Sequence, residues 1–121
     1  MNHPVVWFEV RGKDGSKLQQ FYGELFGWKI NTDNPGGYGE VDTTGATRGI
    51  PGGVGDVAPG GRAWVTFYVE SSDLDRSLAE VEKRGGKILM PPRSVGPDTT
   101  IAHFQDPEGN VVGLVKTHAQ A

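Results

Sequence analysis

The chain has 121 residues, a formal net charge of −3 and no cysteine, a composition that suits one domain with its own core and excludes disulfides, thiolate nucleophiles and zinc–thiolate sites. The absence of disulfides fits a cytoplasmic protein. No apolar run reaches roughly 18 residues and basic residues form no cluster longer than Lys83-Arg84, so we expect neither a membrane nor a nucleic acid as partner.

Two short segments, residues 5–10 and 63–69, resemble each other and predict the strands that organise the chain. Alternation along a strand puts apolar side chains on one face of each segment. These side chains are Val6, Phe8 and Val10, then Val65, Phe67 and Val69. The opposite faces carry Trp7 and Glu9, then Trp64, Thr66 and Tyr68. We expect the apolar faces to lie beneath helices and the mixed faces to line a ligand cavity; tryptophans that fill a core or an interface are the alternative.

The first half continues with a helix and three strands. Ser16 is predicted to cap the helix, with Gln19 completing a capping box, and Gly27 to end it. Helical spacing predicts one buried stripe: Leu18, Phe21, Tyr22, Leu25 and Phe26. Strands are predicted over residues 28–30, 38–42 and 47–53, with a turn at 34–37.

Residues 54–62 are predicted to be a linker, and the second half repeats the first. Ser72 or Asp73 caps a helix that ends at Gly85-Gly86. Strands follow over residues 87–89, 99–105 and 111–116, with a type I turn at 106–109.

The predicted fold is therefore α+β, with tandem βαβββ modules forming a curved, cup-shaped mixed sheet and helices on its outer face. We expect a single domain over residues 1–121, with module one at about 5–53, the linker at 54–62 and module two at about 63–116. Each module leaves one sheet face bare, so two modules, from one chain or from two, would enclose the cup.

Several segments resemble the vicinal oxygen chelate superfamily, which includes glyoxalase I, bleomycin-resistance proteins and extradiol dioxygenases. They are Phe-Tyr-Gly-Glu-Leu-Phe-Gly-Trp (residues 21–28), Gly-Ile-Pro-Gly-Gly (49–53) and Phe-Gln-Asp-Pro-Glu-Gly-Asn (104–110) with the following Val-Val-Gly-Leu. The resemblance covers almost the whole chain. It implies cups that are typically built from two chains, so we expect a homodimer.

The resemblance also implies where a divalent metal would bind in related enzymes, usually to His on the first strand and Glu on the last strand of each module. The matching positions here are Trp7, Gly49, Trp64 and Gly113. None of these side chains can donate an electron pair to a metal. We therefore expect no metal and no other cofactor. A rearranged site from Glu9, Glu40 and His103 stays open as an alternative.

The candidate ligand-binding residues are Trp7, Glu9, Tyr38, Arg48, Trp64, Thr66, Tyr68 and His103. The favoured hypothesis is metal-independent binding of a small, planar aromatic molecule in a cup lined by tryptophan, as in bleomycin-resistance sequestration. The net negative charge would not repel a cationic ligand. The alternative is a glyoxalase-like lyase or isomerase, or a dioxygenase-related enzyme, that works through Glu9, His103 or an unusual metal site. The sequence leans toward a binding protein rather than an enzyme.

Overall fold

The computed structural model describes residues 3–43 and 48–117, which form eight strands and two helices. The first βαβββ series is β1 (Val5–Gly12), α1 (Gly15–Phe26), β2 (Lys29–Asn31), β3 (Gly39–Asp42) and β4 (Gly52–Asp56). The second series is β5 (Trp64–Glu70), α2 (Leu74–Lys83), β6 (Lys87–Gly96), β7 (Thr99–Gln105) and β8 (Val111–Thr117). Both predicted βαβββ patterns are confirmed.

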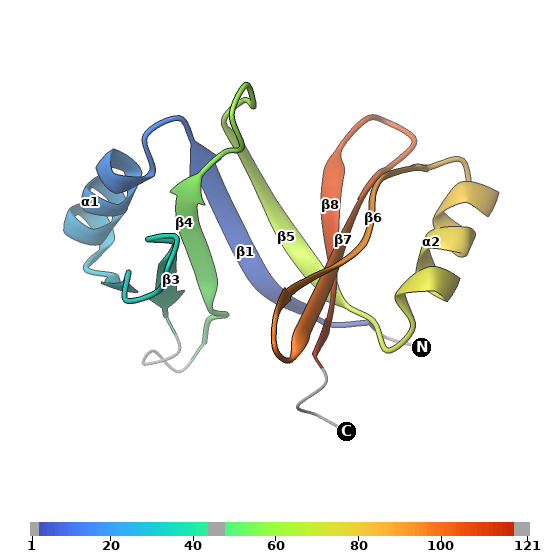
Figure 1. The fold of residues 1–121 in the computed structure, drawn as a ribbon, viewed down its shortest axis with the longest axis horizontal. Coiled ribbons are helices and arrows are strands. Elements are labelled where there is room, and N and C mark those ends of the chain that lie inside the picture. The colour runs from blue at the N-terminus through green and yellow to red at the C-terminus, as the bar shows by residue number, and fades with distance from the viewer. Residues whose placement is uncertain (1–2, 44–47, 118–121) are drawn as a thin grey trace. The chain divides into compact units, whose positions relative to one another are not determined.

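Strand pairing is mixed in both series, as predicted. In the first series, β1 pairs in parallel with β4, and β3 lies antiparallel to both β4 and β2. In the second series, β5 pairs in parallel with β8, and β7 lies antiparallel to both β8 and β6. Helix α1 lies along β4, and α2 lies along β6 and β7 (Figure 1). The chain divides into two compact units, residues 7–66 and residues 67 onward together with those before 7.

The strand predicted over residues 47–53 is wrong in position, because β4 covers Gly52–Asp56. The reason lies in its glycines. Phe8 lies so close to Gly52 that an added β-carbon would meet its ring at 2.3 Å. Glycine is thus required where the ring crosses the neighbouring strand. The predicted linker at 54–62 therefore begins too early, because its first residues, up to Asp56, belong to β4.

Helix α1 begins two residues earlier than predicted, and its buried face differs from the predicted stripe. Asp14, not Ser16, is the N-cap and accepts a hydrogen bond from the Lys17 amide, whereas Gly27 ends the helix with φ 69° as expected. Phe21, Leu25 and Phe26 are all more than half exposed.

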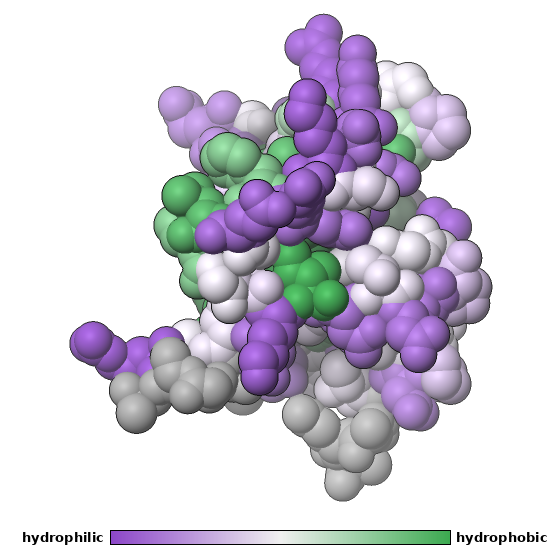
Figure 2. All heavy atoms as spheres, turned by 90° about the vertical axis from the view of Figure 1, so that its left-hand side faces the viewer, coloured by the Kyte–Doolittle hydropathy of each residue, from purple (hydrophilic) through white to green (hydrophobic). Residues whose placement is uncertain are grey.

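The face of α1 that meets β4 carries a glycine and a glutamine. Gly15 is buried against the backbone of Gly55 and Asp56, where a β-carbon would lie 2.7 Å from main-chain atoms. One helical turn later, the Gln19 amide donates to the main-chain oxygen of Val54 at 2.8 Å. This close contact turns part of the apolar stripe outward, and Figure 2 shows apolar side chains at the surface on this side of the molecule.

The second unit has the larger aliphatic core. Asp73 caps α2 by accepting from the Arg76 amide, as one of the two predicted candidates. The buried residues of this core are Leu74, Leu78, Ala102 and Leu114, with Val69, Ile88 and Phe104 packed against them. The expectation that all apolar side chains of β5 lie beneath a helix is wrong for Val65, which is 72% exposed, and for Phe67 at 43%.

Neither helix in the described ranges has the length and hydropathy that crossing a membrane requires.

Candidate functional site

A buried carboxylate lies at the centre of the first unit. Glu9 on β1 is only 4% exposed, and both of its oxygens accept hydrogen bonds. The Arg11 guanidinium donates from Nε to Oε1 at 2.9 Å and from Nη2 to Oε2 at 3.2 Å. The Tyr38 hydroxyl donates to Oε2 at 2.7 Å. A carboxylate buried in this way is stabilised by its cationic and hydroxyl partners, so its geometry is fixed.

Trp7 extends this network to an aromatic ring. Its indole Nε1 donates to the Tyr38 hydroxyl at 3.2 Å. The Arg11 guanidinium lies 5.0 Å from the centre of the Tyr38 ring, within cation–π distance, and it also donates to the main-chain oxygen of Asp56 at 2.7 Å. Hydrogen bonds therefore join Trp7, Tyr38, Glu9 and Arg11 in one network, which we call the Glu9 network.

Glycines on β4 make room for the Tyr38 ring. Gly53 pairs with Glu9 in the β1–β4 register. An added β-carbon at Gly53 would lie 1.6 Å from the Tyr38 hydroxyl oxygen, and one at Gly55 would lie 2.8 Å from the ring. The tyrosine thus occupies the space that side chains on β4 would fill.

The turn before β3 holds Tyr38 from the other side. Asn34 accepts from the Tyr38 amide at 3.0 Å and donates to its main-chain oxygen at 2.7 Å. The predicted turn at 34–37 therefore has a second role, because it fixes the backbone of the residue that contacts Glu9.

Burial raises the pKa of Tyr38 well above its ordinary value of 10.0, and the Glu9 carboxylate and its hydrogen bond raise it further. The phenol consequently remains protonated at neutral pH. It acts as a hydrogen-bond donor to Glu9 and as an acceptor for Trp7.

The second unit contains a comparable arrangement. Tyr68 on β5 is 3% exposed, and its hydroxyl lies 2.7 Å from Nε2 of His103 on β7. Gly113 on β8 pairs with Tyr68, and an added β-carbon there would lie 2.4 Å from the tyrosine ring. In each unit, therefore, a tyrosine ring covers a glycine of the last strand and hydrogen-bonds to an ionisable side chain.

The remaining predicted residues are Trp64, Thr66 and Arg48. Trp64 is half-buried at the start of β5, and Thr66 is 6% exposed. Arg48 is exposed and precedes β4, so its predicted place in a strand is wrong. Gly49 also precedes β4, and Gly53 rather than Gly49 is the glycine opposite Glu9.

The sequence analysis missed Arg11, because the first predicted strand ended at residue 10. Strand β1 continues to Gly12, so alternation puts Trp7, Glu9 and Arg11 on one face. The signal was present in the sequence as this i, i+2, i+4 spacing.

The residues present do not fit a divalent metal of the kind that related enzymes bind. Among the residues of 3–43 and 48–117, no group of three or more His, Asp or Glu side chains comes together. Both Glu9 oxygens already accept hydrogen bonds, and indole and glycine stand at Trp7, Gly53 and Gly113. Indole and glycine side chains are not metal ligands.

Comparisons with known proteins agree with this fold. Residues 4–114 match the family model described as the glyoxalase/bleomycin resistance protein/dioxygenase superfamily. A glyoxylase-like domain-containing protein of Didymella fabae is 31% identical over 112 residues, with 88% of each chain covered.

Two solved structures illustrate the likeness in fold. A superfamily member from Vibrio splendidus 12B01 has a TM-score of 0.63 at 16% identity, covering 95% of this chain and 99% of that one. Methylmalonyl-CoA epimerase from Mycobacterium tuberculosis has a TM-score of 0.65 at 14% identity, covering 97% and 91%. At these identities the structures show the fold alone. With the family match spanning residues 4–114, the chain belongs to the glyoxalase/bleomycin resistance protein/dioxygenase superfamily.

Proposed function

We propose that this protein binds a small, planar aromatic molecule without a metal, with the Trp7 indole as the main contact surface. The observation that carries this proposal is the hydrogen bond from Trp7 to Tyr38, which is itself held by Glu9 and Arg11. A ring whose orientation is fixed before binding loses little conformational entropy when a ligand stacks on it. Each stacking contact is worth about 1 kcal/mol beyond the apolar area that it buries.

The ion pair in the Glu9 network refines the class of ligand. Arg11 and Glu9 are 2.9 Å apart, so the carboxylate charge is already balanced. Glu9 therefore acts as a positioning residue for Tyr38 and Trp7 rather than as the counter-ion of a cationic ligand. We expect neutral planar aromatics to bind at least as well as cationic ones of equal size.

Fluorescence titration with a panel of planar aromatic compounds tests the proposal. Trp7→Ala should abolish the tightest quenching response, and Tyr38→Phe should weaken it because the indole loses its fixed orientation. Trp28→Phe is the matched control. Trp28 belongs to a separate aromatic cluster, with ring centres 5.3 Å from Phe8 and 5.7 Å from Tyr22, so binding should persist in this variant.

Two results would contradict the proposal. One is an affinity that stays unchanged in Trp7→Ala, and the other is a response that disappears equally in Trp28→Phe. Circular dichroism of each variant separates loss of binding from loss of fold. In parallel, elemental analysis after dialysis against a chelator should find far less than one nickel, zinc, iron or manganese ion per chain.

The Tyr68–His103 contact favours a second candidate function, a lyase or isomerase that moves a proton on a vicinal-oxygen substrate. A hydroxyl and an imidazole 2.7 Å apart can pass a proton between them. Deuterium incorporation from D₂O into a hemithioacetal or into methylmalonyl-CoA would reveal this chemistry. His103→Asn should then abolish incorporation while leaving the Trp7-dependent quenching unchanged. No incorporation by the unsubstituted protein would exclude this candidate for these substrates.

A further inference from the structure

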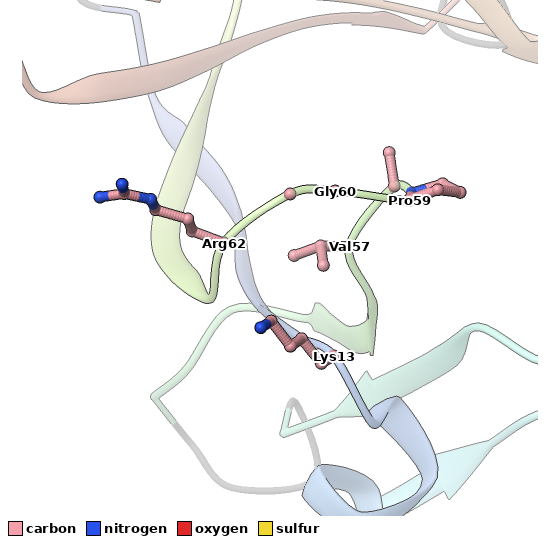
Figure 3. A pocket seen from close by; sticks show the side chains of 7 residues that line it. Lys13, Val57, Pro59, Gly60 and Arg62 are labelled. Carbon is pink, nitrogen blue, oxygen red and sulfur yellow. The ribbon is translucent and has the colours of Figure 1, made fainter.

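A surface hollow in the first unit lies between the end of β1 and the loop that follows β4. Its volume is about 420 Å³. The residues that line it are Lys13, Val57, Ala58, Pro59, Gly60, Gly61 and Arg62 (Figure 3). This volume lies within the range of sites that hold small organic molecules. None of these residues belongs to the Glu9 network.

The loop that shapes the hollow has a defined conformation. The Gly61 amide donates to the Ala58 oxygen at 2.8 Å, Pro59 occupies the second position of the turn, and Gly60 has φ 81°. These features define a type II turn. The Val57 amide donates to the Gly12 oxygen at 2.9 Å and so fastens the loop to the end of β1. The hollow is therefore formed before any ligand arrives.

The charge of the hollow is positive in a chain whose net charge is −3. Lys13 and Arg62 line it, and none of the lining residues is acidic. Within residues 3–43 and 48–117, Arg11 pairs with Glu9 and Arg84 pairs with Glu80, and neither ion pair includes Lys13 or Arg62. In Figure 3 the two side chains extend toward the same side.

The neighbouring acidic side chains are engaged elsewhere. Asp14 accepts a hydrogen bond from the Lys17 amide at 3.1 Å, and Asp56 accepts one from the Gly15 amide at 2.6 Å. Both carboxylates thus bind the first turn of α1. They stabilise the helix, and neither carboxylate pairs with Lys13 or Arg62.

We propose that this hollow binds a phosphate monoester, with its phosphate between Lys13 and Arg62 and its organic group against Val57, Ala58 and Pro59. A guanidinium forms paired hydrogen bonds with phosphate oxygens, and an ammonium adds a point charge. Two cations match a group that carries nearly two negative charges. The apolar part of the lining offers a surface to the organic group.

The test is a titration of the ¹⁵N-labelled full chain with phenyl phosphate, followed by amide NMR. Phenyl phosphate should shift the amides of Gly60, Gly61 and Arg62, with an affinity that falls as salt is added. Inorganic phosphate should shift the same amides more weakly, and phenol should leave them unchanged. Trp7→Ala should not alter the titration, so the outcome is independent of the proposed function above.

Variants assign the effect to the two cations. Lys13→Ala and Arg62→Ala should each weaken binding by about tenfold, the size expected for one charge-assisted hydrogen bond. Lys17→Ala removes an exposed cation from the first turn of α1 and should have no effect. Unchanged affinity in the double variant, shifts with phenol alone, or inorganic phosphate binding as tightly as phenyl phosphate would each overturn the proposal.

Discussion

The Tyr38 hydroxyl occupies the position where the side chain of residue 53 would begin. An ideal β-carbon on Gly53 would lie 1.6 Å from the Tyr38 oxygen, and the same oxygen donates to Glu9 at 2.7 Å. Because Gly53 on β4 has no β-carbon, Tyr38, which directly precedes β3, can reach the Glu9 carboxylate on β1.

Gly53→Ala should therefore be strongly destabilising. The added methyl must displace Tyr38, which leaves a buried Glu9 with one hydrogen bond fewer. We expect a loss of about 2–3 kcal/mol in the free energy of unfolding, measured by urea titration. Gly36→Ala is the control, since no atom lies within 4 Å of a β-carbon there. Equal stability of the two variants would show that Tyr38 can move at little cost.

The same relationship in the second unit predicts an effect on His103. Gly113→Ala should displace the Tyr68 ring, because the added β-carbon would lie 2.4 Å from it. The hydrogen bond to His103 would then be lost. The imidazole ¹⁵N chemical shifts of His103 should change in this variant and stay constant in Gly96→Ala, where no atom lies within 4 Å. Unchanged imidazole shifts in both variants would contradict the prediction.

The raised pKa of Tyr38 predicts a loss of stability at alkaline pH. Below the ordinary value of 10.0, the phenol is protonated in both the folded and the unfolded chain, so the contribution of Tyr38 is fully present. Above it, the unfolded chain releases a proton that the folded chain retains. The free energy of unfolding should fall by up to about 1.4 kcal/mol per pH unit from this group.

Urea titrations at increasing pH measure this dependence. Tyr38→Phe has no phenol to ionise, so its stability should decline less steeply above the ordinary tyrosine pKa than that of the unsubstituted protein. Parallel declines for the two proteins would mean that Tyr38 ionises as readily in the folded chain as in the unfolded one.

Of the two residues predicted to cap α2, Ser72 and Asp73, the structure has Asp73 as the N-cap. Asp73 accepts from the Arg76 amide at 3.1 Å, whereas Ser72 is exposed and precedes the cap. Asp73→Ala should lower the free energy of unfolding by about 1 kcal/mol, and Ser72→Ala should change it very little. Thermal unfolding of both variants checks the assignment. A larger effect of the serine variant would move the cap to residue 72.

The exposed apolar side of α1 bears on the homodimer that we propose for this protein. Phe21 is 56% exposed, and Leu25 and Phe26 are each 57% exposed. Sedimentation velocity at micromolar concentrations should give a dimer. If this side of α1 forms the contact, Leu25→Lys should give a monomer, and Gln20→Lys, on the same helix, should not. A dimer in both variants would place the contact elsewhere, and a monomeric unsubstituted protein would refute the proposed dimer.

The order of helices and strands followed from local sequence patterns. Alternation in β1 and β5, helical spacing in α1 and α2, and turn residues such as those at 106–109 act over a few neighbouring residues, so they can be read from the chain itself. The helix end at Gly27 and the cap at Asp73 are of this kind. That Trp7 and Gly113 carry no side chain able to bind a metal also follows from residue type alone.

The Glu9 network required tertiary structure, because its members come from separate elements. Tyr38 reaches Glu9 only because β3, β4 and β1 lie side by side, and because Gly53 leaves the space open. Helix α1 shows the same limit. Its periodicity predicted a buried Leu25, yet the close contact of Gly15 with the strand backbone turned that side chain outward. Sequence periodicity specifies an apolar stripe, whereas the distance of closest approach between helix and sheet decides which part of it is buried.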